Sequence, residues 1–544
     1  MMAPRANLVV IGQVVVAARM DGLETAEAIG IANGRVVTVG AERDVLDAAA
    51  SGARVIDEPG AAIVPGLHDF HLHVLGMAHA RHAVDLEGCR DFGELVERVR
   101  DAADGLPRDG WVRGDGWAET VLDPRRLHLL EAAVQRRPAL LETHDRHSAW
   151  ASATALDIAG VGAGTPDPDG GRFERAPDGA PNGILRERAA DIVADVAGRL
   201  TGAELATAIA DIVSELLGMG ITGATDAGDP TTANGTGPFA ELGDSFSNLA
   251  EHRAAFEGRL RLSVDLPADA IPQARRLGLR SGDRLAGSEM LRVGWAKRYA
   301  DGALGSRTAA LFEPYTCSPG DTGILRTTPD ELDELVAYAR LARIGLAVHA
   351  IGDRAVAMVL DALERADPRQ PGVPLDRIEH AQLVRAQDRA RFATLGVVAS
   401  LQPAHCPSDR ETAELCWADR LPDSYAWRSL AVAGALIAFG SDAPIETPNP
   451  WIGLFVAAHR RVPGDHAADW RPDEGVGAIQ ALSSYTLGPA RAALRPDEGH
   501  LRPGAWADLA ILDVDLPTLL AGDDPAGQAR ALMTLIAGRE AFRR

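Results

Sequence analysis

Short apolar, β-branched runs alternate with Ala/Leu/Arg-rich helical stretches along the middle of the chain. This alternation is the pattern of parallel β/α units, and eight such strands are the number that forms a (β/α)8 barrel. We therefore predict an α/β fold with a TIM-type barrel over residues 63–494. The predicted strands are Ile63–His73, Gly220–Asp226, Leu260–Asp265, Leu291–Lys297, Gly345–His349, Asp376–His380, Gly396–Gln402 and Ala435–Asp442.

The sequence pattern at both chain ends differs from that in the middle of the chain: short β-rich runs are separated by turn signals. Asn33-Gly34 lies between two such runs and predicts a hairpin. Neither end has enough strands for a core of its own. We therefore expect residues 1–62 and 495–544 to pair into one small β-sandwich-like domain.

The interval between the first two predicted barrel strands is far too long for one helix. We predict that residues 78–205 form an inserted subdomain over the catalytic face, because an insertion after a barrel strand emerges there. It would be the source of substrate specificity. Trp117, His147 and Trp150 would suit an aromatic-lined pocket, with Trp117 a candidate substrate contact, although most tryptophans in such subdomains are core. Glu187 is expected on a helix surface.

Charge and cysteine content limit the partners and the compartment. With 77 acidic and 55 basic side chains the formal charge is -22, which argues against nucleic acid or an anionic membrane as partner. No run approaches the roughly 20 apolar residues that span a bilayer. The four cysteines fit neither a disulfide framework nor a zinc knuckle, so a reducing cytoplasm is expected. A small-molecule substrate is expected, and a homo-oligomer remains open.

Polar groups recur where the predicted barrel strands end. His71 and His73 share one face of an extended strand and could present two imidazoles to one cation. Each group alone has an ordinary structural explanation, such as a hydrogen-bonded core histidine or a helix cap. Together they indicate a site at the C-terminal end of the barrel. The set is His71, His73, Lys297, His349, His380 and Asp442.

The chain resembles the amidohydrolase superfamily, in particular its amidohydrolase-3 branch, which includes YtcJ-like proteins and N-substituted formamide deformylases. The resemblance covers nearly the whole length. The matching stretches are Pro65–His73, Lys297–Ala309, Val348–Val356, Arg377–His380, Gln402–His405, Gly440–Pro444 and Gly499–Asp508.

The resemblance implies a divalent metal site of one or two ions. The four histidines would be ligands, and Asp442 would be both a ligand and the proton shuttle. Lys297 would be carboxylated to a carbamate that bridges two metals, the alternative being an unmodified lysine beside one ion. Zinc is the first expectation, with iron or manganese as alternatives. His405, Asp301 and Arg307 are candidate substrate contacts.

The implied activity is hydrolysis of a non-peptide C–N bond, in a linear amide, formamide or carbamate, by metal-activated hydroxide. Ester, lactone or phosphotriester hydrolysis on the same barrel is the alternative, because hydroxide attack is common to all of them. A non-catalytic binding or scaffold protein is a third reading. All six positions are filled, which disfavours that reading.

Overall fold

The computed structural model describes residues 4–19, 21–197, 200–228, 237–466, 468–521 and 527–544. Its central sheet has eight parallel strands in the spatial order β5-β12-β13-β14-β15-β16-β17-β18. This confirms the predicted barrel. The strands are β5 (Leu67–Leu72), β12 (Ile221–Asp226), β13 (Arg261–Pro267), β14 (Leu291–Tyr299), β15 (Leu346–Ala350), β16 (Arg377–His380), β17 (Val398–Leu401) and β18 (Leu436–Phe439).

Helices between consecutive strands cover the outside of the barrel. All residues of β5, β12 and β15 are buried, as expected for strands covered on both faces. Thr328 and Glu331 form a capping box that fixes where α10 begins. The barrel helices are α7 (Gly202–Gly218), α8 (Asp244–Glu251), α9 (Ile271–Arg276), α10 (Pro329–Ala342), α11 (Asp353–Arg365), α12 (Ala386–Leu395), α15 (Trp427–Val432), α17 (Ala478–Tyr485) and α18 (Leu487–Ala492).

The first and last barrel strands meet just beyond their C-terminal ends. A parallel bridge joins Leu72 to Ala443. The backbone N–H of Asp442 donates to the carbonyl of His71 at 2.7 Å. This contact brings together two groups that are far apart in sequence.

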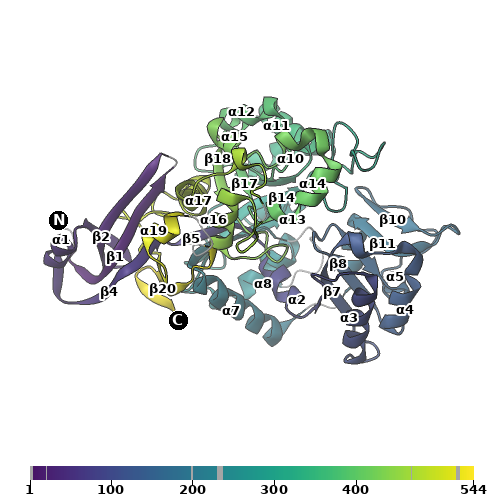
Figure 1. Cartoon of the computed structure of the whole chain (residues 1–544), viewed down its shortest axis with the longest axis horizontal. Helices are drawn as coiled ribbons and strands as arrows, with labels where there is room; N and C mark the ends of the chain where they lie inside the picture. Colours follow the sequence, from purple (N-terminus) through teal and green to yellow (C-terminus); the bar gives the residue numbers. More distant parts are fainter. Residues whose placement is uncertain (1–3, 20, 198–199, 229–236, 467, 522–526) are drawn as a thin grey trace.

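The two chain ends share one seven-stranded sheet, ordered β21-β20-β19-β4-β1-β2-β3, which lies to the left of the barrel in Figure 1. The two ends meet where β4 runs antiparallel to β19. A separate apolar cluster, which includes Val10 and Ile511, forms its core. The strands are β1 (Ala6–Arg19), β2 (Gly22–Ala32), β3 (Arg35–Gly40), β4 (Ala49–Pro65), β19 (Leu509–Leu512), β20 (Ala531–Ile536) and β21 (Arg539–Arg543).

The predicted first barrel strand, Ile63–His73, is divided in the structure. Its first residues belong to β4, and the barrel strand begins at Leu67. Gly66 is the junction, where an added Cβ would lie 2.0 Å from Oγ1 of Thr222. The chain therefore passes from one sheet to the other at a residue that only glycine can occupy without displacing β12.

The long segment after β5 forms a third sheet, ordered β10-β11-β9-β8-β7-β6, at the right of Figure 1. A cluster that includes Phe92 and Trp150 is one part of its core. Its elements are β6 (Val84–Asp85), α3 (Phe92–Asp104), β7 (Val112–Trp117), α4 (His128–Val134), β8 (Ala139–Thr143), β9 (Ser148–Ala151), α5 (Ala153–Ile158), β10 (Gly171–Arg175), β11 (Pro181–Glu187) and α6 (Arg188–Ala194).

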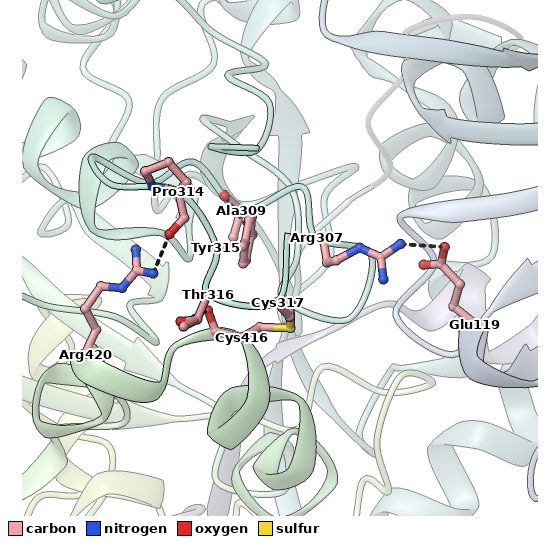
Figure 2. The surroundings of a disulfide bond; sticks show 9 residues. All are labelled: Glu119, Arg307, Ala309, Pro314, Tyr315, Thr316, Cys317, Cys416 and Arg420. Carbon is pink, nitrogen blue, oxygen red and sulfur yellow. Dashed lines mark hydrogen bonds and ion pairs between the residues drawn. A yellow bond between two sulfur atoms is a disulfide. The ribbon is translucent and has the colours of Figure 1, made fainter. Parts of the chain in front are cut away.

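One expectation about cysteine is wrong. Cys317 and Cys416, 99 residues apart, form a disulfide, whereas Cys89 and Cys406 are free and buried. Figure 2 shows that the bond ties the loop after β14 to the end of α14 (Arg410–Cys416). The fold brings the two sulfurs together, which spacing along the chain does not reveal. This pairing removes the cysteine argument for a reducing compartment.

Within the described part of the chain, we find no helix with the length and apolar character needed to cross a bilayer.

Candidate active site

A cavity of about 210 Å³ opens at the C-terminal ends of the barrel strands. The barrel lines one side of it with His71, His73, Lys297, His380 and Asp442. The turn between β8 and β9 in the inserted sheet, residues 144–147, lines another part. The structure therefore brings together groups that are up to several hundred residues apart.

His71, His73 and Asp442 form a triad. Nε2 of His71 lies 3.3 Å and Nε2 of His73 lies 3.2 Å from Oδ1 of Asp442. The opposite ring nitrogens are engaged: Nδ1 of His71 donates to Glu379 at 2.5 Å, and Nδ1 of His73 donates to the Gly228 carbonyl at 2.9 Å. In neutral imidazoles this leaves the two Nε2 lone pairs directed at a carboxylate oxygen. Three converging acceptors fit a cation.

His380, His405 and Asp442 form a second group whose ligand atoms also lie within 4.8 Å of one another. Nε2 of His405 donates to Oδ2 of Asp442 at 3.1 Å. Nδ1 of His380 is buried and, among the described residues, has no hydrogen-bond partner. A buried ring nitrogen without a partner is costly unless a cation or water engages it. The donor set therefore fits a metal, and His405 lies closer to it than the sequence suggested.

His349 lies beside the second group but outside both triads. Its ring centroid is 4.5 Å from that of His380. Its Nε2 donates to the Gly302 carbonyl at 3.1 Å, which leaves Nδ1 as the nitrogen that could bind a cation.

Lys297 lies among these groups on β14. Its Nζ is 3.3 Å from Nε2 of His71, and the residue is only 4% exposed. Burial lowers the pKa of the Lys297 amine below its usual value, although Glu379 and Asp442 oppose the shift. The amine is thus positioned among the candidate ligands but needs modification before it can bind a cation.

A buried ionic network contacts Nδ1 of His71, the ring nitrogen that faces away from Asp442. The Arg377 guanidinium contacts Glu379 and Asp265, each at 2.6 Å, and stacks on Phe70. Burial alone would raise the pKa of Glu379, but Arg377 and His71 lower it to about 2. The carboxylate is therefore ionised and fixes the tautomer and orientation of His71.

The backbone is strained where two of these groups emerge. His380 and Asp442 have φ values of 71° and 63°, and Ala381, which follows His380, has 41°. Residues other than glycine rarely adopt this left-handed region, and each such residue costs about 1–3 kcal/mol. This backbone conformation directs both side chains into the cavity at the point where their strands end.

The other predicted substrate contacts lie elsewhere. Trp117 is 2% exposed, belongs to the core of the inserted sheet, and donates to the Leu141 carbonyl at 3.1 Å. Asp301 is buried and accepts three backbone N–H bonds, and burial raises its pKa to about 7. Arg307 pairs with Glu119 at 3.5 Å and has a side chain 44% exposed (Figure 2). None of these three lines the cavity.

Sequence reasoning missed the roles of two side chains, Glu379 and Glu187. The sequence pattern assigns no role to Glu379, although Arg377 and Glu379 alternate in a strand buried on both faces, where a charge needs a partner. Glu187 was expected on a helix surface, which is wrong, since it is 1% exposed. It accepts a hydrogen bond at 2.9 Å from His147, which lines the cavity beside His349. No local pattern showed that these two residues pair.

Comparisons with known proteins identify the family. The model of a family described as "Amidohydrolase family" matches residues 54–542. The chain is 30% identical to the putative amidohydrolase YtcJ of Bacillus subtilis, over 84% of each chain. It is 29% identical to an N-substituted formamide deformylase of Arthrobacter pascens, covering 94% of this chain and 93% of that protein.

A solved structure agrees as well. The crystal structure of an uncharacterized metal-dependent hydrolase from Pyrococcus horikoshii has a TM-score of 0.73 and 26% identity, covering 93% of this chain and 97% of that one. From the family match across the barrel and its cavity, together with these relatives, we conclude that the chain belongs to the amidohydrolase family and is a hydrolase that acts on carbon–nitrogen bonds.

Proposed function

We propose that this protein hydrolyses a non-peptide C–N bond in a small linear amide, formamide or carbamate, with a divalent metal as cofactor. The observation that carries the proposal is the convergence of two imidazole lone pairs on the Asp442 carboxylate inside the cavity. The relative named as a formamide deformylase supports the substrate class.

We assign the metal to His71, His73, His349, His380, Asp442 and a carboxylated Lys297. When bound, one or two divalent ions, with zinc as our first choice, supply a Lewis acid for the substrate carbonyl and make water reactive near neutral pH. The amine of Lys297 is buried beside His71, where a carbamate would replace a poorly tolerated ammonium.

Asp442 handles the proton in this proposal. Burial alone would raise the pKa of the Asp442 carboxyl, but His71 and the other histidines that contact it hold this pKa well below its usual range, so the group is ionised. It takes a proton from the attacking water and delivers it to the leaving nitrogen, which would otherwise depart as an amide anion. His405, bonded to the second carboxylate oxygen, keeps Asp442 in position.

We assign a different role to each part of the chain. We assign residues 63–494 to the hydrolase barrel and residues 78–205 to an inserted subdomain that shapes the substrate site. Residues 1–62 and 495–544 form the third part, whose sheet carries no residue of the cavity.

Metal analysis joined to a substrate panel tests the proposal. We expect the purified protein to contain one or two equivalents of divalent metal and to hydrolyse aryl formamides. A chelator should abolish turnover, and added metal should restore it. Gentle intact-mass measurement should find one carbon dioxide adduct, absent from a Lys297→Met variant. Faster hydrolysis of lactones or phosphotriesters, with formamides untouched, would overturn the assignment.

A further inference from the structure

The turn between β8 and β9 is a hydrogen-bonded part of the cavity wall. Oγ1 of Thr143 donates to Oδ1 of Asp145 at 2.6 Å, and the same oxygen accepts the backbone N–H of His147 at 3.1 Å. Ser306, in the loop after β14, donates to Asp145 at 2.6 Å. The inserted sheet and the barrel therefore hold this turn together, and it ends at His147.

His147 is oriented by a buried carboxylate. Its Nδ1 donates to Oε2 of Glu187 at 2.9 Å, and the Arg326 guanidinium contacts the same oxygen at 3.0 Å. The Glu187 side chain is fully buried. Burial alone would raise the pKa of Glu187, but His147 and Arg326 lower it. The Arg326 guanidinium also donates to Asp191 at 2.8 Å. Arg326 is therefore itself held in place beside the pair formed by His147 and Glu187.

The backbone of Glu187 is strained, with φ 52° and ψ −127° at the end of β11. This conformation is rare for a residue with a side chain and costs about 1–3 kcal/mol. The backbone N–H of Glu187 donates to the carbonyl of His147 at 2.9 Å, so the two residues are tied through main chain and side chain. Such doubly fixed geometry is typical of a group held for binding or chemistry.

The imidazole of His147 lies in the part of the cavity that holds the candidate metal ligands. It lines the cavity, and its ring centroid lies 5.1 Å from that of His349. With Nδ1 committed to Glu187, Nε2 is the nitrogen left for a ligand. A group bound there lies next to the candidate metal ligands, where the bond to be cleaved must sit.

We propose that His147 contacts the substrate through Nε2, at the polar group that is cleaved, and that Glu187 is the residue that positions it. The inserted subdomain then contributes a binding side chain to the site, beyond shaping the entrance. This inference rests on the proposed function for the chemical class of substrate, an amide-type carbonyl compound. It does not depend on which C–N or C–O bond breaks.

Three variants test the contact: His147→Gln, Glu187→Gln and the double variant. Loss of one hydrogen bond to a reacting polar group should lower kcat/KM by about 10–100-fold in His147→Gln, mainly through kcat. Glu187→Gln should lower it less. The double variant should be no slower than His147→Gln alone, because Glu187 acts through His147. His128→Gln, at an exposed position of the same subdomain, is the matched control and should keep wild-type kinetics.

Metal content and thermal unfolding are measured on the same samples. Metal content should match the wild type in all three variants, and thermal unfolding should match it in His147→Gln, which separates a substrate contact from a ligand or a purely structural role. A His147→Gln variant with kcat/KM within twofold of wild type, or one that loses metal, would overturn the proposal. Additive losses in the double variant would overturn the positioning role of Glu187.

The substrate panel keeps the two proposals separable. If the wild type cleaves lactones and not amides, the proposed function fails. The ratio of wild type to His147→Gln on the lactone still measures the contact.

Discussion

The barrel and the inserted sheet line one cavity in different ways. The barrel contributes single residues from separate strand ends, such as Lys297 and His380, each aimed inward by the end of its strand. The inserted sheet contributes four consecutive residues, 144–147, from one turn, together with Arg113 on β7 and Glu142 on β8. Barrel groups are therefore spread over the sequence but share one geometric rule, whereas the turn residues are adjacent and depend on their particular partners.

Those partners differ as well. In the barrel, His71 is held by Glu379 and Arg377, all three from barrel strands. On the inserted side, His147 is held by Glu187 from its own sheet and by Arg326 from a barrel loop. We infer that the barrel side determines the chemistry, because it holds the acceptors that fit a cation. We infer further that the inserted side contributes to substrate binding.

The largest expected effect is on the barrel side. Asp442→Asn keeps the shape of the side chain but removes the carboxylate that accepts and returns the proton. We expect kcat to fall by about 10²–10⁴-fold, the range typical of a lost general acid–base group. Steady-state kinetics with metal-replete enzyme measures it, and Asp109→Asn, at an exposed site, is the control. Wild-type turnover in Asp442→Asn would remove Asp442 from the mechanism.

A smaller effect is expected for Glu379, which contacts the candidate ligand His71 but does not line the cavity. Glu379→Gln leaves His71 with a neutral acceptor and leaves the buried Arg377 with one carboxylate partner fewer. Loss of an outer-shell carboxylate typically costs about 10–100-fold in metal affinity or activity. Competition with a metal-sensitive dye gives the affinity, and the exposed Glu411→Gln is the control. Unchanged affinity and activity would show that the barrel side does not need its ionic network.

The smallest effect is expected where the inserted sheet meets the barrel loop at the surface. Arg307 pairs with Glu119 through a half-exposed side chain (Figure 2). Exposed ion pairs contribute about 0–1 kcal/mol, and this residue does not line the cavity. Arg307→Ala should change kcat/KM by less than about twofold and barely shift the unfolding midpoint in urea. A loss as large as that in His147→Gln would mean that this contact controls the cavity wall.

Periodicity and strand counting were enough for the barrel, because most parallel strands buried on both faces are largely apolar runs. The same logic located the strand-end groups, since parallel strands in a barrel all end on one face. The point at which the chain passes from β4 to β5 was harder to predict from the sequence. Gly66 divides the predicted strand because Thr222 fills the space where a Cβ would lie. That clash depends on a strand more than 150 residues away.

Pairings across the fold were not readable from the sequence. A tryptophan in a strand has the same local pattern whether its ring lies in a core, as Trp117 does, or in a cavity. The Cys317–Cys416 disulfide and the pair of His147 with Glu187 depend on which loops lie side by side.

The sequence by itself therefore determined the barrel and the list of groups at the strand ends, because both follow from local period and strand order. Only the tertiary structure decided which nitrogen of each histidine faces the centre, that His405 joins Asp442, and that Glu187 is buried. The physical reason is that orientation and burial are set by contacts between segments that are distant in the chain.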